Sequence, residues 1–196
     1  DEAAKRRDAA QNPYWFMLSA LVHDFGKAVS TEAVGGTLHA YQHEVAGLPL
    51  AKAFLQRITG ETKLIAYVLN MVELHMKPNT MAHMGSSPKN TNRLFDRSAD
   101  PEGLIALALS DDRGRILAQP TADTELFLRA RLALFRELMA QPYVMGRDLI
   151  EAAIRPDKDF TDILDYAHKL RLAGVKKDDA LKQTLAYAGN LKKKED

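Results

Sequence analysis

The segment from Asn12 to Phe25 places the strongest constraint on how this chain can fold. Asn12-Pro13 combines a helix N-cap residue with a proline at the first helical position. The residues from Tyr14 to Phe25 are apolar on nearly every side of the helix that they would form. A helix without a polar face needs other elements around it. We therefore expect this helix at the centre of the fold.

Helix signals continue along the rest of the chain. Gly35-Gly36 indicates a loop, and the stretch from Met76 to Asn92 is rich in Pro, Gly, Ser and Asn, so it is predicted as an irregular lid or substrate loop. No segment alternates with the period of a strand, and no internal repeat is found. The sequence therefore predicts an all-α helical bundle. Further helices are predicted over 41–58 with a break at 47–49, over 61–76, 92–97, 101–111, 121–139, 146–154, 159–172 and 178–188.

The 196 residues suit one large domain or a domain with an appendage. The composition shifts after Pro142, so we predict a main domain over 1–142 and a small C-terminal helical extension over 143–196. Lysines in this extension could contact an RNA backbone, or they could form a solvated tail. They are Lys176, Lys177, Lys182, Lys192, Lys193 and Lys194.

Composition narrows the possible chemistry. The chain has 27 basic and 26 acidic residues and a formal net charge of +1, so contact with nucleic acid would need a local patch. It has no cysteine, which excludes disulfides and thiolate metal sites. The remaining His and carboxylate ligands suit Mg, Mn, Fe, Ni or Co. The sequence makes no prediction of an oligomeric state.

No apolar run approaches the roughly 20 residues of a membrane span, and no leader opens the chain, so we expect a cytoplasmic protein without membrane contact. The first residue is not Met, and the segment from Asp1 to Arg7 is typical of the middle of a helix. We therefore expect the chain to be a piece of a longer protein.

The adjacent pair His23-Asp24 lies where the central helix is predicted to end. Neighbouring helix residues point about 100° apart, so both can bind one ion only where the backbone bends away. We expect Gly26 to supply that bend in a left-handed conformation, and Lys27 to attract an anion. The motif predicts a divalent-metal site facing a phosphate. The alternative is a capped helix end at the surface.

Other histidines are candidates for the same site. His39 and His43 are four residues apart, which would place both on one helix face, with His43 pointing inward. His75, at the end of a predicted helix, could bind metal or phosphate, or could cap that helix. His83 and His168 are interpreted as structural.

A second cluster follows the apolar segment Leu104–Ser110. Asp111 could supply a further carboxylate ligand beside Asp24. Arg113 and Arg115 could bind a phosphate through two hydrogen bonds each, although a local salt bridge between Asp and Arg explains them almost as well.

These motifs, taken in order, resemble the HD superfamily of metal-dependent phosphohydrolases. The similarity covers most of the chain and is greatest to the HD domain in the C-terminal half of bacterial tRNA nucleotidyltransferases, the CCA-adding enzymes. The motifs are Leu21-Val22-His23-Asp24-Phe25-Gly26-Lys27, His39 with His43-Glu44, Glu73-Leu74-His75, Leu94-Phe95-Asp96, Ser110-Asp111-Asp112-Arg113-Gly114-Arg115 and Gly146-Arg147-Asp148-Leu149-Ile150.

The resemblance implies an HD-domain helical bundle that hydrolyses phosphoester or nucleotide substrates with a divalent metal ion. His23, Asp24 and Asp111 would hold the ion. The remaining phosphate charge would be steadied by Lys27, His43, His75 or Arg113.

The chain departs from the HD pattern in two ways. The superfamily usually takes a further His ligand upstream of the HD pair, and none precedes His23 here. The strand-rich nucleotidyltransferase head is also missing. The longer protein could contact tRNA. The alternative functions are a non-catalytic helical module that binds tRNA or acts as a scaffold, and a nucleotide-sensing HD domain.

Overall fold

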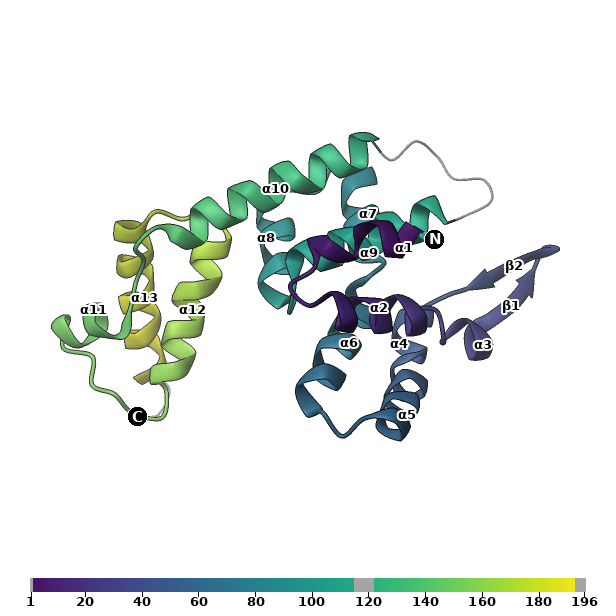
Figure 1. The fold of residues 1–196 in the computed structure, drawn as a ribbon. Coiled ribbons are helices and arrows are strands. Elements are labelled where there is room, and N and C mark those ends of the chain that lie inside the picture. The colour runs from purple at the N-terminus through teal and green to yellow at the C-terminus, as the bar shows by residue number, and fades with distance from the viewer. Residues whose placement is uncertain (1, 115–121, 193–196) are drawn as a thin grey trace. The chain divides into compact units, whose positions relative to one another are not determined.

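The computed structural model describes residues 2–114 and 122–192, and helices dominate this part of the chain (Figure 1). The predicted all-α class is confirmed. The chain forms two compact units: unit 1 comprises Asp1–Ser86 and Leu94–Leu132, and unit 2 comprises Ser87–Arg93 and Ala133–Asp196. Residues 87–93 thus belong with the C-terminal part, whereas the sequence analysis set a single boundary between 142 and 143.

The elements of unit 1 are α1 (Glu2–Arg6), the 3-10 helix η1 (Arg7–Ala9), α2 (Pro13–Val22), α3 (Lys27–Ser30), β1 (Thr31–Val34), β2 (Thr37–Ala40), α4 (His43–Ala46), α5 (Leu48–Ile58), α6 (Thr62–Leu74), α7 (Lys77–His83) and α9 (Pro101–Arg113). Unit 2 contains α11 (Gly146–Glu151), α12 (Phe160–Leu172) and α13 (Lys177–Lys192). Two helices, α8 (Pro88–Arg97) and α10 (Ala122–Ala140), have residues in both units. Within the described residues, no helix is both long enough and apolar enough to cross a bilayer.

The central helix begins as predicted but ends earlier. The Asn12 side chain accepts hydrogen bonds from the backbone N–H groups of Tyr14 and Trp15, both at 3.1 Å, and Pro13 occupies the first turn. The helix ends at Val22, so His23 and Asp24 lie in the turn that follows it. This position frees the two side chains from helical spacing.

The buried core of unit 1 includes α9. All residues from Gly103 to Ser110 are buried, which explains why this segment has no polar face. Its N-cap Asp100 is fully buried and accepts a hydrogen bond from the Gly103 backbone N–H at 2.9 Å. Since α9 runs through the core, its C-terminal end brings Asp111 to the same region as the turn after α2.

A β-hairpin corrects the expectation that the chain has no strands. Strands β1 and β2 are antiparallel, with Val34 paired to Thr37 across a two-residue turn. Gly35 and Gly36 have φ values of 59° and 79°, which the tight hairpin turn requires. Each strand has only four residues, and β1 is exposed throughout. No buried face therefore imposed an alternating pattern on the sequence.

The expectation that the stretch from Met76 to Asn92 is irregular is also wrong. It contains α7 and the beginning of α8, and only residues 84–87 between them are non-helical. Pro78 and Pro88 lie in the first turns of these helices, where proline is compatible with a helix because the missing N–H has no partner there. The prolines therefore mark helix starts, and the stretch is not a lid loop.

Unit 2 has its own hydrophobic core. Its buried residues include Leu149 of α11, together with Ile163 and Ala167 of α12. The Arg171 guanidinium donates to the Leu138 and Met139 carbonyl oxygens at the end of α10. Gly174, predicted to stop α12, adopts φ of 78° two residues after the helix ends.

Candidate metal centre

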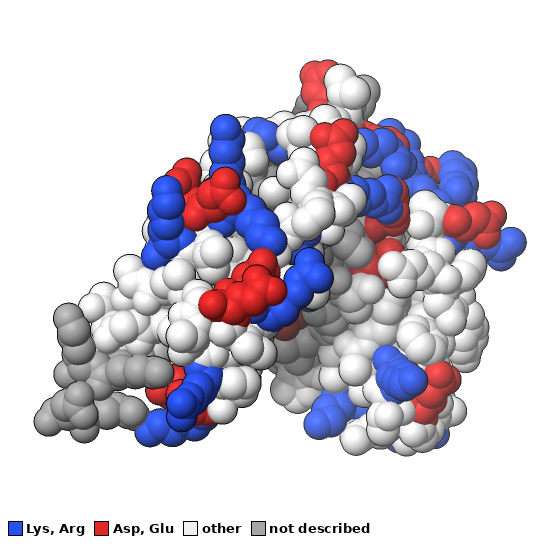
Figure 2. All heavy atoms as spheres, turned by 90° about the vertical axis from the view of Figure 1, so that its left-hand side faces the viewer, with Lys and Arg blue, Asp and Glu red and all other residues white. Residues whose placement is uncertain are grey.

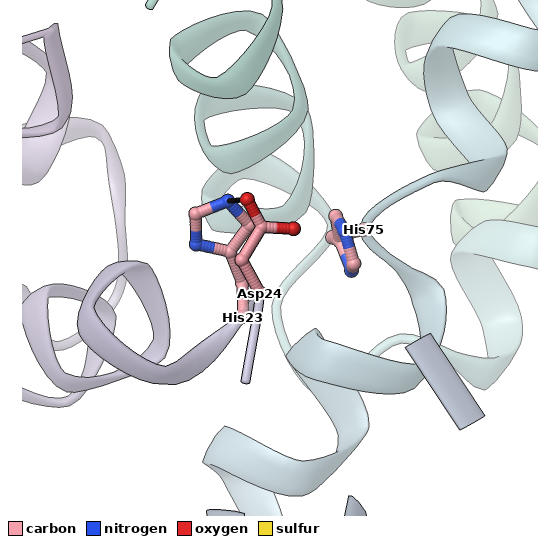
Figure 3. A group of neighbouring side chains, drawn as sticks. All are labelled: His23, Asp24 and His75. Atoms are coloured by element: carbon pink, nitrogen blue, oxygen red, sulfur yellow. Dashed lines mark ion pairs between the residues drawn. The ribbon is translucent and has the colours of Figure 1, made fainter. Parts of the chain in front are cut away.

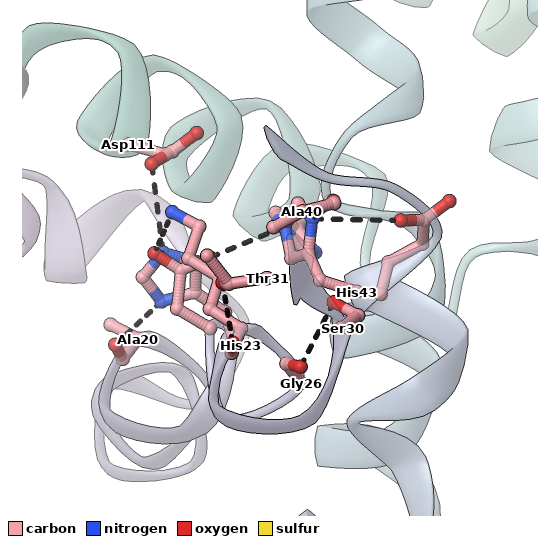
Figure 4. A network of polar contacts seen from close by, with 12 residues as sticks. Ala20, His23, Gly26, Ser30, Thr31, Ala40, His43 and Asp111 are labelled. Carbon is pink, nitrogen blue, oxygen red and sulfur yellow. Dashed lines mark hydrogen bonds and ion pairs between the residues drawn. The ribbon is translucent and has the colours of Figure 1, made fainter. Parts of the chain in front are cut away.

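Five side chains from four parts of unit 1 converge on one point. His23 and Asp24 come from the turn after α2, His43 from the first position of α4, His75 from the residue after α6, and Asp111 from the last turn of α9. Figure 3 shows His75 across from the adjacent pair, and Figure 4 adds His43 and Asp111. The structure thus brings together the three predicted ligands and two of the predicted charge-steadying residues.

The distances within this cluster suit the ligands of one ion. His23 Nε2 lies 3.3 Å from Asp24 Oδ2 and 3.7 Å from Asp111 Oδ1. His43 Nε2 lies 3.2 Å from Asp24 Oδ1 and 3.3 Å from His75 Nε2. Atoms that bind one ion at about 2.0–2.2 Å lie roughly 3–4 Å from each other. Neighbouring pairs in the cluster have about that spacing, and His23, Asp24 and His75 each offer one ligand atom within 4.8 Å of the other two.

The three histidines are oriented in the same way. In each ring, Nδ1 lies close to the carbonyl oxygen three residues earlier in the chain. The distance is 2.9 Å for His23, 2.9 Å for His43 and 2.7 Å for His75. A carbonyl oxygen can only accept, so each Nδ1 carries the proton. In a neutral ring, Nε2 is then a bare lone pair. All three lone pairs face the cluster, as metal-ligating histidines require.

Lone pairs of neighbouring side chains face one another in the cluster. His23 Nε2 and Asp24 Oδ1 are buried and have no hydrogen-bond partner among the described residues. The Nε2 atoms of His43 and His75 approach to 3.3 Å with both ring protons on the far side. Such groups repel one another unless a proton or a metal cation lies between them. The donor set therefore fits a divalent ion.

The pKa values of His23, Asp24 and His75 are shifted by burial and by their charged neighbours. Burial disfavours the charged form of His23, but the neighbouring carboxylates of Asp111 and Asp24 outweigh burial and raise its pKa to about 10. Burial also opposes ionisation of Asp24, but its contacts with His23 and Lys27 hold the pKa of Asp24 well below its usual range. Burial lowers the pKa of His75, which keeps that ring neutral and able to act as a ligand.

Lys27, but not Arg113, lies at the cluster. The Lys27 Nζ is 2.6 Å from Asp24 Oδ2, so its positive charge lies beside the cluster, where it was predicted to attract an anion. Arg113 forms an ion pair with Glu125 at 3.2 Å, and it is not among the residues that line the pocket at the cluster. Arg115 lies outside the described residues.

The pocket beside the cluster has a volume of about 470 Å³. Residues of α1 form part of its wall, together with the turn after α2 and the end of α9. It is lined by Glu2, Ala3, Ala20, His23, Asp24, Lys27, Leu107, Ser110, Asp111 and Gly114. This volume can hold a small phosphoester next to the ligand atoms.

Gly26 is required for a reason other than the predicted one. Its φ of −64° is ordinary right-handed helical backbone, so the expected left-handed bend is wrong. A Cβ atom on Gly26 would overlap the carbonyl oxygen of His43 and lie 2.7 Å from the backbone N of Gly47. Gly26 therefore lets the turn that holds His23 and Asp24 pack directly against the backbone of α4.

The expected pairing of His39 with His43 on one helix is wrong. His39 lies in β2 and stacks on Tyr41, with ring centroids 5.3 Å apart. Of the remaining histidines, His83 is exposed at the end of α7, and His168 lies in α12 of unit 2. Both are outside the cluster, so three of the six histidines form it.

The sequence analysis missed the carbonyl oxygens that orient the rings. Those of Ala20, Ala40 and Val72 accept from the three Nδ1 atoms. A backbone carbonyl has no sequence signature. Gly47 was noted only as a helix break, although it also contacts the backbone of Gly26.

The basic residues of the C-terminal extension are partly neutralised. Lys177 Nζ lies 2.9 Å from Asp148 Oδ1, and Lys182 Nζ lies 3.9 Å from Asp179 Oδ1. On the face drawn in Figure 2, Lys and Arg side chains lie next to Asp and Glu side chains. Lys193, Lys194 and the side chain of Lys192 lie outside the described part of the chain.

Comparison with protein-family models, with curated proteins and with solved structures found no match.

Proposed function

We propose that unit 1 is a metal-dependent phosphohydrolase domain, as its resemblance to the HD superfamily implies. The observation that carries the proposal is the convergence of three imidazole Nε2 atoms and two carboxylates from four segments of the chain. His23 Nε2 and Asp24 Oδ1 are buried there without a hydrogen-bond partner among the described residues, and a pocket lies beside them.

The donor set narrows the choice of ion. Imidazole nitrogen suits late transition metals such as Fe and Ni and carboxylate suits Mn, whereas Mg takes oxygen ligands and keeps several waters. With three imidazoles and two carboxylates, we propose a transition metal rather than Mg. His43 and His75 then belong to the ligand set instead of steadying the phosphate.

The residues divide the work of hydrolysis between them. When bound, the ion supplies Lewis acidity, which neutralises charge on a phosphate oxygen and lowers the pKa of water. Lys27 offers a positive charge at the pocket wall, where it can hold a second phosphate oxygen. The contacts of Arg113 do not support a role in phosphate binding, because it pairs with Glu125 and does not line the pocket.

The proposal is tested by hydrolysis of bis-p-nitrophenyl phosphate and of a 2′,3′-cyclic nucleotide by the metal-free chain after addition of Mn²⁺, Co²⁺ or Ni²⁺. We expect activity only with metal, and its loss in both Asp24→Asn and His23→Ala. His83→Ala is the matched control, because it removes an exposed histidine outside the cluster. Equal hydrolysis by the parent and the ligand variants would refute the proposal.

We further propose, on the same resemblance, that the chain is part of a cytoplasmic protein related to tRNA nucleotidyltransferases. The ion pairs of Lys177 and Lys182 give no support to the alternative of a tRNA-binding module. Salt-sensitive tRNA binding that is lost on removing the C-terminal lysines would support that alternative instead.

A further inference from the structure

A second pocket adjoins the metal cluster on the side of α5. It has a volume of about 530 Å³ and is lined by Asp24, Phe25, Ala28, Leu50, Ala53, Phe54 and Arg57. Asp24 lines this pocket as well as the first one. A ligand held by the cluster can therefore extend into the second pocket, which we call the aromatic pocket.

The walls of the aromatic pocket are flat and fixed. The rings of Phe25 and Phe54 meet edge to face, with centroids 5.5 Å apart and an angle of 79° between their planes. Both rings are partly buried against the core of unit 1. Aromatic surfaces held in this way favour a planar aromatic ligand through edge-to-face or offset contacts. A small alkyl group would gain much less contact.

Arg57 provides a polar contact at the same pocket. It lies in the last turn of α5, is exposed, and has no hydrogen bond or ion pair with any described residue. The other charged residue of the lining, Asp24, is paired with Lys27 and the histidines. The guanidinium therefore remains available for a ligand, and it suits a carboxylate or another hydrogen-bond acceptor.

We propose that the aromatic pocket binds a planar aromatic group of the phosphoester substrate, and that Arg57 pairs with an acceptor or anionic group on that aromatic system. The inference rests on the proposed function, because it takes the phosphoester to lie at the cluster. It narrows the substrate class from phosphoesters in general to aromatic phosphoesters with an acceptor on the ring system. The acceptor can belong to a nucleobase or to a substituted aryl group.

Phosphonates separate the contributions of the ring and the acceptor without turnover. We would measure binding of methylphosphonate, phenylphosphonate and 4-carboxyphenylphosphonate to the Mn²⁺-loaded chain by calorimetry. Burial of the phenyl ring should tighten binding about 10-fold over methylphosphonate. The carboxylate should add a further gain of about 5-fold or more through Arg57.

Variants assign each gain to its residue. Phe54→Leu keeps apolar volume but removes the flat wall, so the phenyl gain should fall to about 3-fold or less. Arg57→Ala should remove the carboxylate gain and keep the phenyl gain. Lys52→Ala is the matched control. It removes a cation from the same helix, α5, but Lys52 lines a different pocket. Thermal unfolding of each variant verifies that it is folded.

The results separate this inference from the proposed function. If phenylphosphonate binds no tighter than methylphosphonate, or if both gains survive in Phe54→Leu and Arg57→Ala, the aromatic pocket is not a substrate subsite. If methylphosphonate and phenylphosphonate bind as expected but no phosphoester is hydrolysed, only the proposed function fails. Binding gains that follow the two variants support the inference in either case.

Discussion

Gly26 and His43 are packed backbone against backbone, so closely that a Cβ atom on Gly26 would overlap the carbonyl oxygen of His43. The contact joins the turn that holds His23 and Asp24 to the helix that begins with His43. Two ligand-bearing elements are therefore held together by the absence of a side chain. The geometry of the cluster therefore depends on a contact between two backbones.

Gly26→Ala should therefore impair both stability and metal binding. The methyl group meets backbone rather than a flexible side chain, so α4 must shift, and we expect a loss of about 2 kcal/mol or more in the free energy of unfolding. Affinity for Mn²⁺ should fall at least 10-fold, since the ligands move apart. Gly60→Ala is the control, because a Cβ there meets nothing within 4 Å. Wild-type affinity in Gly26→Ala would contradict the expectation.

Metal addition should stabilise the chain, and a chelator should reverse the effect. At a metal concentration about 100 times the dissociation constant, linkage predicts about 2.7 kcal/mol of stabilisation. Thermal unfolding with and without Co²⁺ measures it. His75→Ala should remove most of the shift, because His75 is buried and its Nε2 faces the cluster. If His75→Ala keeps the full shift while His83→Ala loses it, metal binds elsewhere.

Much of the fold could be predicted because helix signals are local. Asn12-Pro13 and Asp100-Pro101 both mark helix starts that the structure contains. The short hairpin of β1 and β2 could not be found in this way, since its exposed strands have no buried face to create alternation. The prolines of α7 and α8 indicated a loop in the sequence, but they lie in the first turns of helices, where proline is also common.

The candidate site was predictable in its residues but not in its arrangement. The pair His23-Asp24 and the distant Asp111 carried the resemblance, and the structure places both carboxylates within 3.7 Å of His23 Nε2. The inward direction of His43 and His75 depends on carbonyl oxygens and on the close approach of Gly26, which are tertiary features. Arg113 looked equally suitable in sequence, yet it pairs with Glu125 of α10, and residue spacing alone does not predict that these two helices meet.

Lys27 should affect substrate binding more than metal binding. It is half exposed and pairs with Asp24 at 2.6 Å, so its removal takes positive charge from the pocket and leaves the proposed ligands in place. We expect Lys27→Met to raise KM for a phosphoester about 3- to 10-fold, with Mn²⁺ affinity unchanged or increased. Lys27→Arg should restore most of the loss. A large drop in metal affinity in Lys27→Met would show a structural role instead.

Asp100 should be a major determinant of stability in unit 1. Its fully buried carboxylate accepts from the backbone N–H of Gln11 at 2.8 Å, from the Tyr67 hydroxyl at 2.9 Å and from the backbone N–H of Gly103. Asp100→Ala leaves three donors without a partner and should cost about 3 kcal/mol or more. Trp15 packs edge to face on Tyr67, so its fluorescence reports urea unfolding of unit 1.

Tyr67→Phe provides the comparison for that measurement. It removes one donor together with its hydrogen bond, so we expect a cost of about 1 kcal/mol. Burial and the Asp100 carboxylate raise the pKa of Tyr67, so the hydroxyl stays protonated and keeps donating at any ordinary pH. Equal costs for Asp100→Ala and Tyr67→Phe would mean that the two backbone contacts contribute little.

Asp148 should make the start of α11 sensitive to acid. Hydrogen bonds from the Lys177 side chain and from the Met145 backbone N–H lower the pKa of Asp148. Because the folded pKa is depressed, the stabilisation is fully present above the unfolded value of about 4 and is lost as pH falls through the folded value. Hydrogen exchange of the α11 amides should be faster in Asp148→Asn than in wild type at pH 7. The ratio should approach one as the pH falls well below 4, and a ratio independent of pH would show that the charge of Asp148 does not stabilise this helix.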